Sequence, residues 1–253
     1  MTLGEAFSLK TREVISLVGG GGKTALMFAL GQELPSRRKG IILTTTTKIW
    51  EPAASPHLAL FLSDQFSEIK RWVKNNIDQY PCLLIAQKKL DKGKLQGIPP
   101  QWVEEFQSLK NISKIVIEAD GAAGRSLKAP RAGEPVVPKN TSLLVPVVGI
   151  DVLGCPLDEQ HVFRSEIASQ LLNLPIGSRV TEEIVARLVA ETIKNRPDKA
   201  RIIPFINKVD IPGGLEKARN LARSLFKIDR GKIESVLLGQ AQYFPWVKEI
   251  ISA

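Results

Sequence analysis

Apolar positions along the chain form two kinds of pattern. Short runs rich in Val, Ile and Leu predict buried strands at 14–18, 40–43, 82–86, 115–117, 142–148, 201–206 and 233–238. Between them, apolar residues recurring every three or four positions predict helices at 24–34, 64–77, 100–109, 164–173, 181–194 and 214–227. Strands that alternate with helices predict a three-layer α/β domain with a mostly parallel sheet.

The remaining segments complete this organisation. Residues 1–13 are expected to be a short lead-in, and the basic stretch 88–97 a hairpin or surface loop. Pro35 is expected to end the first helix, and Arg37-Arg38-Lys39 to form a solvated turn. We expect a single domain, 1–253, with a small insertion or subdomain at 50–112.

A few isolated residues allow further expectations. His57 follows Pro56 and is expected at the surface, while Cys82 begins an apolar run and is expected to be buried. The aromatic residues Tyr243, Phe244 and Trp246 near the C-terminus are expected to pack back on the sheet.

Composition excludes several classes of protein. The chain has 253 residues and two cysteines far apart in sequence, which is no disulfide framework and suits a cytoplasmic protein. It shows no signal peptide and no apolar stretch long enough to span a membrane, so we expect no membrane association. The net charge of +9 favours solubility or attraction of anions such as nucleotides. Because basic residues are not interleaved with aromatics, no nucleic-acid partner is expected.

The most informative stretch joins the first strand to the first helix through Gly19, Gly20, Gly21 and Gly22, followed by Lys23 and Thr24. Glycine amides approach an anion closely, and a helix N-terminus adds its dipole. Lys23 would reach the β- and γ-phosphates and the Thr24 hydroxyl would bind Mg²⁺, with Lys23 solvated in the free protein. The alternative is a glycine-rich turn before an incidental Lys-Thr.

The usual spacing of a phosphate-binding loop is not fully kept. Leu17 stands where the first glycine of such a loop is expected, so the turn out of the strand is predicted at Gly19–Gly20.

A second stretch ends a buried strand with Glu118 and, two residues later, Asp120. Side chains two apart on an extended chain point the same way, so both acids could approach one metal or one water. We favour Glu118 as the metal ligand and Asp120 as the residue that positions water or metal. An ordinary strand end with a turn-forming Asp-Gly is the alternative.

Threonines 44–47 follow another apolar run. Their simplest interpretation is strand continuation, since β-branched residues suit strands. The alternative is that one hydroxyl, which we assign to Thr46, faces Mg²⁺ and the γ-phosphate at the carboxyl end of the sheet.

A third stretch ends a strand with Asn207-Lys208-Val209-Asp210. In this pattern the carboxylate of Asp210 would accept from guanine, Asn207 would support the loop and Lys208 would lie along the ring. Adenine lacks these donors, a penalty of about 1–3 kcal/mol, so GTP is favoured and ATP is the alternative. Residues 239–241 would form the loop that closes over the base.

Two loops are more ambiguous. Residues 121–138 carry Arg125, Lys128 and Arg131, which form either a solvated basic loop or a mobile segment that responds to the γ-phosphate. These cations would dock a partner or serve the protein's own nucleotide. Cys155 and His161 lack the spacing of a metal motif and are expected to be loop residues.

The glycine loop, Thr44-Thr-Thr-Thr-Lys48, Ile117-Glu-Ala-Asp-Gly121, Leu127-Lys-Ala-Pro130 and the 207–210 motif together resemble the family of selenium-dependent hydroxylase accessory proteins. The resemblance covers about residues 12–240. More distantly, the chain is similar to the nickel-insertion GTPases of urease and hydrogenase maturation, P-loop proteins of which many are dimers. Their Cys/His metal-binding motif is absent here.

The resemblance implies a P-loop NTPase, a Mg²⁺-dependent GTPase acting in maturation of a selenium-dependent molybdenum hydroxylase. Its partner would be that hydroxylase or its cofactor carrier, and a homodimer is an open alternative to a monomer. Two rival functions are an ATP-dependent kinase or ligase of a small acidic substrate and a nucleotide-binding adaptor without hydrolysis.

Overall fold

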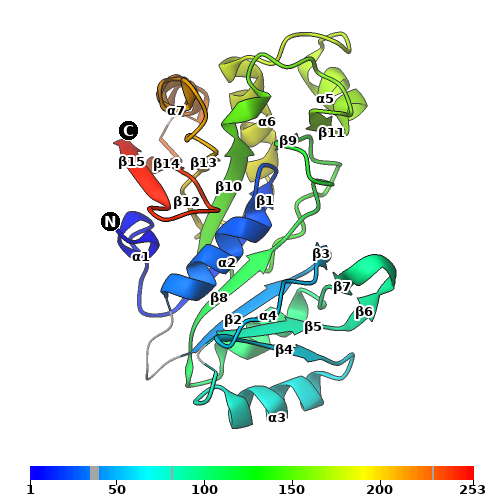
Figure 1. Cartoon of the computed structure of the whole chain (residues 1–253). Coiled ribbons are helices and arrows are strands. Elements are labelled where there is room, and N and C mark those ends of the chain that lie inside the picture. Colours follow the sequence, from blue (N-terminus) through cyan, green and yellow to red (C-terminus); the bar gives the residue numbers. More distant parts are fainter. Residues whose placement is uncertain (35–39, 81, 230) are drawn as a thin grey trace.

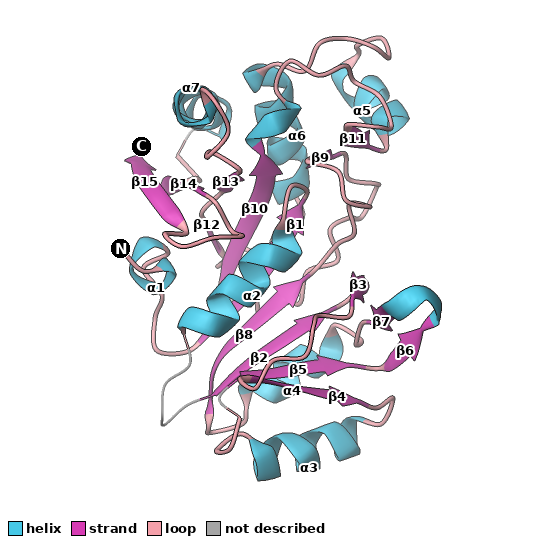
Figure 2. Ribbon diagram, viewed as in Figure 1, coloured by secondary structure: helices cyan, strands magenta, loops and turns pink. Residues whose placement is uncertain are grey.

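A computed structural model gives the fold of residues 1–34, 40–80, 82–229 and 231–253. The helices, coloured separately from the strands in Figure 2, are α1 (Leu3–Ala6), α2 (Lys23–Glu33), α3 (Phe66–Asn76), α4 (Gln101–Gln107), α5 (Ser165–Leu172), α6 (Glu182–Ile193) and α7 (Gly214–Asp229). The strands are β1 (Glu13–Gly19), β2 (Gly40–Thr45), β3 (Lys48–Trp50), β4 (Leu58–Leu62), β5 (Cys82–Ala86), β6 (Lys88–Leu90), β7 (Lys94–Gln96), β8 (Ile112–Glu118), β9 (Leu127–Lys128), β10 (Leu143–Gly149), β11 (Val162–Phe163), β12 (Arg201–Ile202), β13 (Phe205–Asn207), β14 (Ser235–Gly239) and β15 (Val247–Ser252).

In the described part of the chain, ten strands form one sheet in the order β15-β14-β13-β10-β1-β8-β2-β5-β4, with β12 also paired to β10 (Figure 1). Neighbouring strands are parallel except β14 and β15. The fold is therefore α/β with a large, mostly parallel central sheet, as the alternation of strands and helices predicts.

The sheet is covered on both faces, which makes three layers. In β1, Ile15 and Leu17 pack in one cluster with residues of α1 and α2, while Val14 and Val18 pack in another with residues of α3, α4, α6 and α7. Successive side chains of a strand point to opposite faces, so one apolar run supplies both cores.

The predicted helices are all present, with ends that differ by a few residues. Thr181 caps α6 by accepting a hydrogen bond from the Ile184 N–H, and Glu182 and Glu183 follow it in the first turn. The predicted strands are also present, but the run 201–206 is divided into β12 and β13. Pro204 lies between the two strands and has no N–H to donate to the ladder.

Some of the other local expectations are confirmed, and some elements were not expected. His57 is exposed and Cys82 is buried, as expected. The basic stretch 88–97 forms the antiparallel hairpin β6–β7. Its strand β7 pairs with β3, forming a separate small sheet. The lead-in contains α1, and β4 follows His57; neither element was expected. The predictions at Pro35 and Arg37-Arg38-Lys39 fall outside the described residues.

The expectation for the C-terminal aromatic residues is wrong in part. Tyr243 and Phe244 are 61% and 72% exposed, and Trp246 alone of the three packs against the core. The last strand, β15, supplies the contact with the sheet, since its backbone pairs with β14.

Residues 50–112 are joined closely to the rest. Their strands β4 and β5 extend the main sheet beyond β2. Whether this region behaves as an insertion or subdomain stays a prediction.

Candidate functional site

Residues from distant parts of the sequence meet at the carboxyl ends of the parallel strands. The register pairs Leu17 of β1 with Glu118 of β8, and Glu118 also with Thr45 of β2. On the other side of β1, β10 pairs with β13, with Gly149 opposite Asn207. Parallel pairing therefore brings the glycine loop, the acids and the 207–210 motif to one edge, where ligands of α/β proteins gather.

The glycine loop leaves β1 at Gly19, which confirms the predicted place of the turn. Gly19, Gly21 and Gly22 have φ angles of +91°, +71° and +114°. Residues with a Cβ rarely adopt these values, so the conformation requires glycine. The loop leads directly into α2, whose first-turn N–H groups have no acceptor within the helix.

The loop is packed tightly against its neighbours. The Gly20 N–H donates to the Val147 carbonyl at 2.9 Å, and the Gly21 N–H donates to the Arg125 carbonyl at 2.8 Å. A Cβ on Gly20 would lie 2.7 Å from the Arg125 oxygen. Backbone carbonyls thus already accept from these two amides, and their expected approach to an anion stays a prediction.

Lys23 is buried, with 4% of its surface exposed, so the expectation of a solvated lysine is wrong. Its Nζ donates to the Gly19 carbonyl at 2.6 Å and lies 3.2 Å from Asp120 Oδ1 and 3.8 Å from Glu118 Oε1. The side chain folds back from the start of α2 because two carboxylates stabilise its charge there. Removing Lys23 would leave these acids without that cation.

Glu118 and Asp120 both face this lysine, which confirms that the two acids point the same way. Glu118 Oε2 accepts a hydrogen bond of 2.6 Å from the Thr24 hydroxyl. Burial raises the pKa of Glu118, although Lys23 and Thr24 act in the opposite direction. The oxygens of Thr24 and Glu118 therefore meet at the N-terminus of α2.

Asp120 is surrounded by donors. Its two oxygens lie 3.1 and 3.0 Å from the Gly19 nitrogen, and its Oδ2 lies 2.8 Å from Lys128 Nζ. Lys128 is 4% exposed, so of the two alternatives for this loop the solvated one is wrong for Lys128. The ion pair with Asp120 holds Lys128 inside.

Of threonines 44–47, two belong to strand β2 and one lies beside the candidate site. Thr44 and Thr45 belong to β2, and their hydroxyls donate to the carbonyls of Ile85 and Glu118. Thr46 lies just beyond the strand, with its hydroxyl 3.3 Å from the Ala119 carbonyl oxygen. The structure thus places Thr46 next to the acid-bearing segment, while its role toward a metal stays a prediction.

Asn207 links two loops. Its Nδ2 donates to the Gly21 carbonyl at 2.6 Å, and its Oδ1 accepts from the Ala241 N–H at 2.7 Å. Asn207 therefore ties the glycine loop to residue 241, while its predicted role toward a base stays a prediction. Ala241 lies beside Asn207, and the assignment of residues 239–241 to a loop over the base stays a prediction.

The other members of this motif are placed differently. Lys208 Nζ lies 2.7 Å from both Ser126 Oγ and Asp151 Oδ2. Asp210 is exposed in the turn after β13. No motif in the sequence predicted the contacts of Lys208 with Ser126 and Asp151.

A polar cavity of about 160 Å³ lies beside this motif, lined by Gly124, Arg125, Ser126, Asp151, Val152, Gln160, His161 and Lys208. His161 Nδ1 is 2.7 Å from Asp158 Oδ1, so this ring has a carboxylate partner. Within the described ranges, no group of three or more His, Cys, Asp or Glu side chains is arranged to hold a metal ion.

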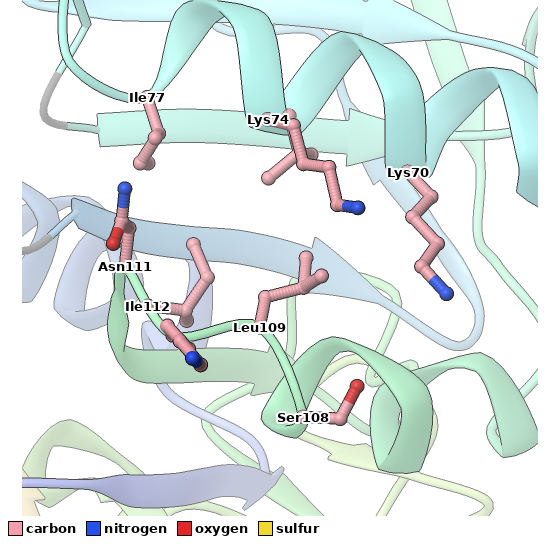
Figure 3. A pocket seen from close by; sticks show the side chains of 9 residues that line it. Lys70, Lys74, Ile77, Ser108, Leu109, Asn111 and Ile112 are labelled. Atoms are coloured by element: carbon pink, nitrogen blue, oxygen red, sulfur yellow. The ribbon is translucent and has the colours of Figure 1, made fainter.

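A larger groove of about 400 Å³ lies far from these residues, between α3 and the segment 108–112 that leads into β8. Figure 3 shows Ile77, which directly follows α3, and Leu109 and Ile112 of this segment pointing into the gap. The groove opens at the amino end of β8, whereas Glu118 ends this strand. It is therefore separate from the candidate site.

Fold and site together define a three-layer α/β protein with buried charges at the carboxyl edge of a parallel sheet. The chain belongs to the YqeC family, whose model, described as YqeC protein, matches residues 15–166. It is 29% identical over 251 residues to a protein of Escherichia coli (strain K12) named "Uncharacterized protein YqeC", with 93% of this chain and 90% of the relative covered.

The family match spans the glycine loop, both acids and Lys128, whereas residues 207–210 lie outside it. In the described ranges, no helix is both long and apolar enough to cross a membrane.

Proposed function

We propose that this protein binds and hydrolyses a nucleoside triphosphate with Mg²⁺ as a P-loop NTPase, with GTP favoured over ATP. The observation that carries the proposal is the meeting of Lys23, Thr24, Glu118 and Asp120 at the N-terminus of α2. A cation, a hydroxyl and two carboxylates beside free helix N–H groups are the parts that a Mg²⁺–triphosphate site needs.

The donor set fits magnesium. Mg²⁺ prefers oxygen ligands and keeps several waters, so few protein ligands are required beside the phosphates. The Thr24 hydroxyl and the Glu118 carboxylate, joined at 2.6 Å, would hold the ion directly or through water, with Asp120 and Thr46 nearby. The ion would neutralise charge on the phosphates as the reaction proceeds.

The preference for guanine rests on Asn207, Lys208 and Asp210. Asn207 fixes the turn by its bonds to the Gly21 carbonyl and the Ala241 N–H. Asp210 is exposed beside this fixed point, so its carboxylate is accessible to the donors of a guanine ring.

Hydrolysis would be a transfer of the terminal phosphoryl group to water. The water oxygen bonds to the γ-phosphorus while the bond to the β–γ bridging oxygen breaks, giving the diphosphate and inorganic phosphate. Lys23 would bind the phosphate oxygens, and Asp120 would orient the water. The tight contacts of Gly20 and Gly21 imply that the loop must rearrange when phosphates bind.

We further propose that hydrolysis serves maturation of a selenium-dependent molybdenum hydroxylase, through the hydroxylase or its cofactor carrier. The support is the family resemblance. Of the three cations of the 121–138 loop, Arg131 is exposed and Arg125 partly so, which leaves these two to meet an acidic partner. Loss of hydroxylase activity in cells that lack this protein, restored by the parent gene, would support the role; unchanged activity would overturn it.

A second candidate function is phosphoryl transfer to a small acidic substrate. The observation that favours it is the polar cavity lined by Arg125, Lys208 and His161. Incubation with γ-labelled nucleotide and cell metabolites distinguishes the two functions: label in inorganic phosphate supports hydrolysis, and label in an organic product supports transfer.

The direct test of the proposed function compares fluorescent GTP and ATP analogues by competition, with and without Mg²⁺. Thr24→Val removes the hydroxyl while keeping the shape of the side chain. We expect roughly tenfold weaker GTP binding in Mg²⁺, equal to about 1.4 kcal/mol, and little change without the ion.

Thr11→Val, at an exposed position away from the loop, is the matched control. A Thr24→Val variant that binds Mg²⁺–GTP as well as the parent would contradict the metal assignment. Equal affinity of the parent for ATP and GTP would contradict the assignment of the base.

A further inference from the structure

Five charged side chains form a chain of contacts that leads away from the glycine loop. Lys23 contacts Asp120, Asp120 contacts Lys128, and Lys128 Nζ lies 3.1 Å from Glu134 Oε2. Glu134 is in turn held by both terminal nitrogens of Arg164. Lys23, Asp120 and Lys128 are each 4% exposed.

The position of the Asp120 carboxylate has the features of an anion site. It receives the Gly19 N–H at 3.0–3.1 Å, with Lys23 Nζ at 3.2 Å and Lys128 Nζ at 2.8 Å. A main-chain N–H at the start of a glycine loop together with two ammonium groups is a donor set suited to a phosphate. Here the protein's own carboxylate takes that place.

Lys128 differs from Arg125 and Arg131 of the same loop because its ammonium group is buried against Asp120. The Arg125 guanidinium donates to the carbonyls of Glu159 and Ala123, and Arg131 is exposed. Lys128 is fixed by its backbone, since β9 pairs with β11 and the Ala129 N–H donates to the Phe163 carbonyl. This pairing directs the Lys128 ammonium group toward Asp120.

We propose that Lys128 is a second phosphate-binding cation of this site. Resting on the proposed function, the inference is that the terminal phosphate of the triphosphate takes the place of the Asp120 carboxylate between the Gly19 N–H, Lys23 and Lys128. Asp120 is then released toward the water or metal. A diphosphate lacks the terminal group, so it does not engage Lys128.

Replacement of the Asp120 carboxylate by a phosphate would also affect residues outside the site. Lys128 shares Glu134 with Arg164, which is the residue immediately before α5. A phosphate that draws Lys128 away from Glu134 therefore changes the contacts of the 121–138 loop and of the start of α5. These contacts therefore differ between the triphosphate-bound and the diphosphate-bound protein, because only the triphosphate carries the charged terminal group.

The test measures the affinities of GDP and of a non-hydrolysable GTP analogue with an imido β–γ bridge. For Lys128→Gln we expect at least roughly tenfold weaker binding of the analogue and less than about threefold weaker binding of GDP. Lys128→Arg should restore most of the loss, because it keeps the charge. Arg131→Gln, in the same loop but exposed, is the matched control and should leave both affinities unchanged.

A second variant keeps the test decisive if Lys128→Gln fails to fold. Asp120→Asn removes the internal anion, so inorganic tripolyphosphate should bind more tightly than to the parent when Mg²⁺ is absent. Thermal melting and circular dichroism establish that each variant is folded. Unchanged or weaker tripolyphosphate binding by folded Asp120→Asn would overturn the inference.

The outcomes separate the two proposals. A parent that binds neither nucleotide overturns the proposed function and this inference together. A parent that binds both, with Lys128→Gln losing GDP and analogue by the same factor, leaves the proposed function standing and overturns the role of Lys128.

Discussion

Two clusters of lysines lie at opposite ends of the β8 strand. At its carboxyl end, Lys23 and Lys128 are buried and paired with Asp120. Near its amino end, Lys70, Lys74 and Lys110 line the groove between α3 and residues 108–112. No ion pair of these three lysines occurs among the residues that the structure describes.

The difference lies in what surrounds each charge. The groove lysines stand beside apolar side chains of α3 and β8, and Lys74 and Lys110 are exposed, so water stabilises their ammonium groups. The buried lysines are surrounded by protein groups in place of water. Both contact Asp120; Lys23 also contacts Glu118 and the Gly19 carbonyl, and Lys128 also contacts Glu134. A buried pair is stable only while both partners remain, because the cost of desolvation stays when one is removed.

The strongest destabilisation should follow from Asp120→Ala, which leaves Lys23 and Lys128 without their shared carboxylate. We expect the free energy of unfolding to fall by about 3–5 kcal/mol, measured by urea unfolding at neutral pH. Asp210→Ala, at an exposed position, is the control and should change it by less than about 0.5 kcal/mol. If Asp120→Ala and Asp210→Ala lowered the free energy of unfolding equally, Lys23 and Lys128 would be hydrated like the groove lysines, and the contrast between the two ends of β8 would be wrong.

A smaller effect is expected from the edge of the buried cluster, at Glu134. Burial opposes the charged form of this carboxyl, but hydrogen bonds from Arg164 and the charge of Lys128 outweigh it and lower its pKa from 4.5 to about 2. Because the folded-state pKa is lowered, the stabilisation is present above pH 4.5 and is lost as the pH falls through about 2.

Glu134→Gln tests this pH dependence. The variant should be less stable than the parent by about 1 kcal/mol at neutral pH, because solvent screens the charges at this partly exposed site. The difference should shrink as the pH is lowered from 4.5 toward 2. Unfolding curves at several pH values measure it, and a constant difference would show that the charge of Glu134 is not what stabilises this contact.

The smallest effect is expected from the groove. The triple change Lys70→Gln, Lys74→Gln and Lys110→Gln removes three charges without breaking an ion pair found in the described residues. The free energy of unfolding should change by less than about 0.5 kcal/mol per site, and GTP affinity should stay the same. A loss of GTP affinity comparable to that of Lys128→Gln would show that the two ends of the sheet are coupled.

The sequence predicted the parts of the site that depend on short stretches. Four glycines between an apolar run and a helical pattern located the turn at Gly19 and the start of α2. Glu118 and Asp120 were predicted to share a direction because side chains alternate along an extended chain. These inferences need only local periodicity and the conformational freedom of glycine, so the pattern was sufficient.

The exposure of charged residues was less predictable. Lys128 lies in a stretch rich in Gly, Ala, Pro and basic residues, which is typical of a solvated loop. The structure buries it because β9 pairs with β11, and neither two-residue strand has a recognisable pattern. Tyr243 and Phe244 show the converse error, since aromatic residues expected to be packed are exposed.

The local patterns alone were enough for the alternation of the main strands and helices, the mostly parallel sheet, and the approach of Glu118 and Asp120 to the start of α2. Tertiary structure alone decided which charges are buried and with what partners. Asn207 reaches Gly21 across 186 positions, and Thr24 reaches Glu118 across 94. Such contacts depend on how strands order and pair in space, and the energy of a buried charge depends on the groups that surround it rather than on its neighbours in the chain.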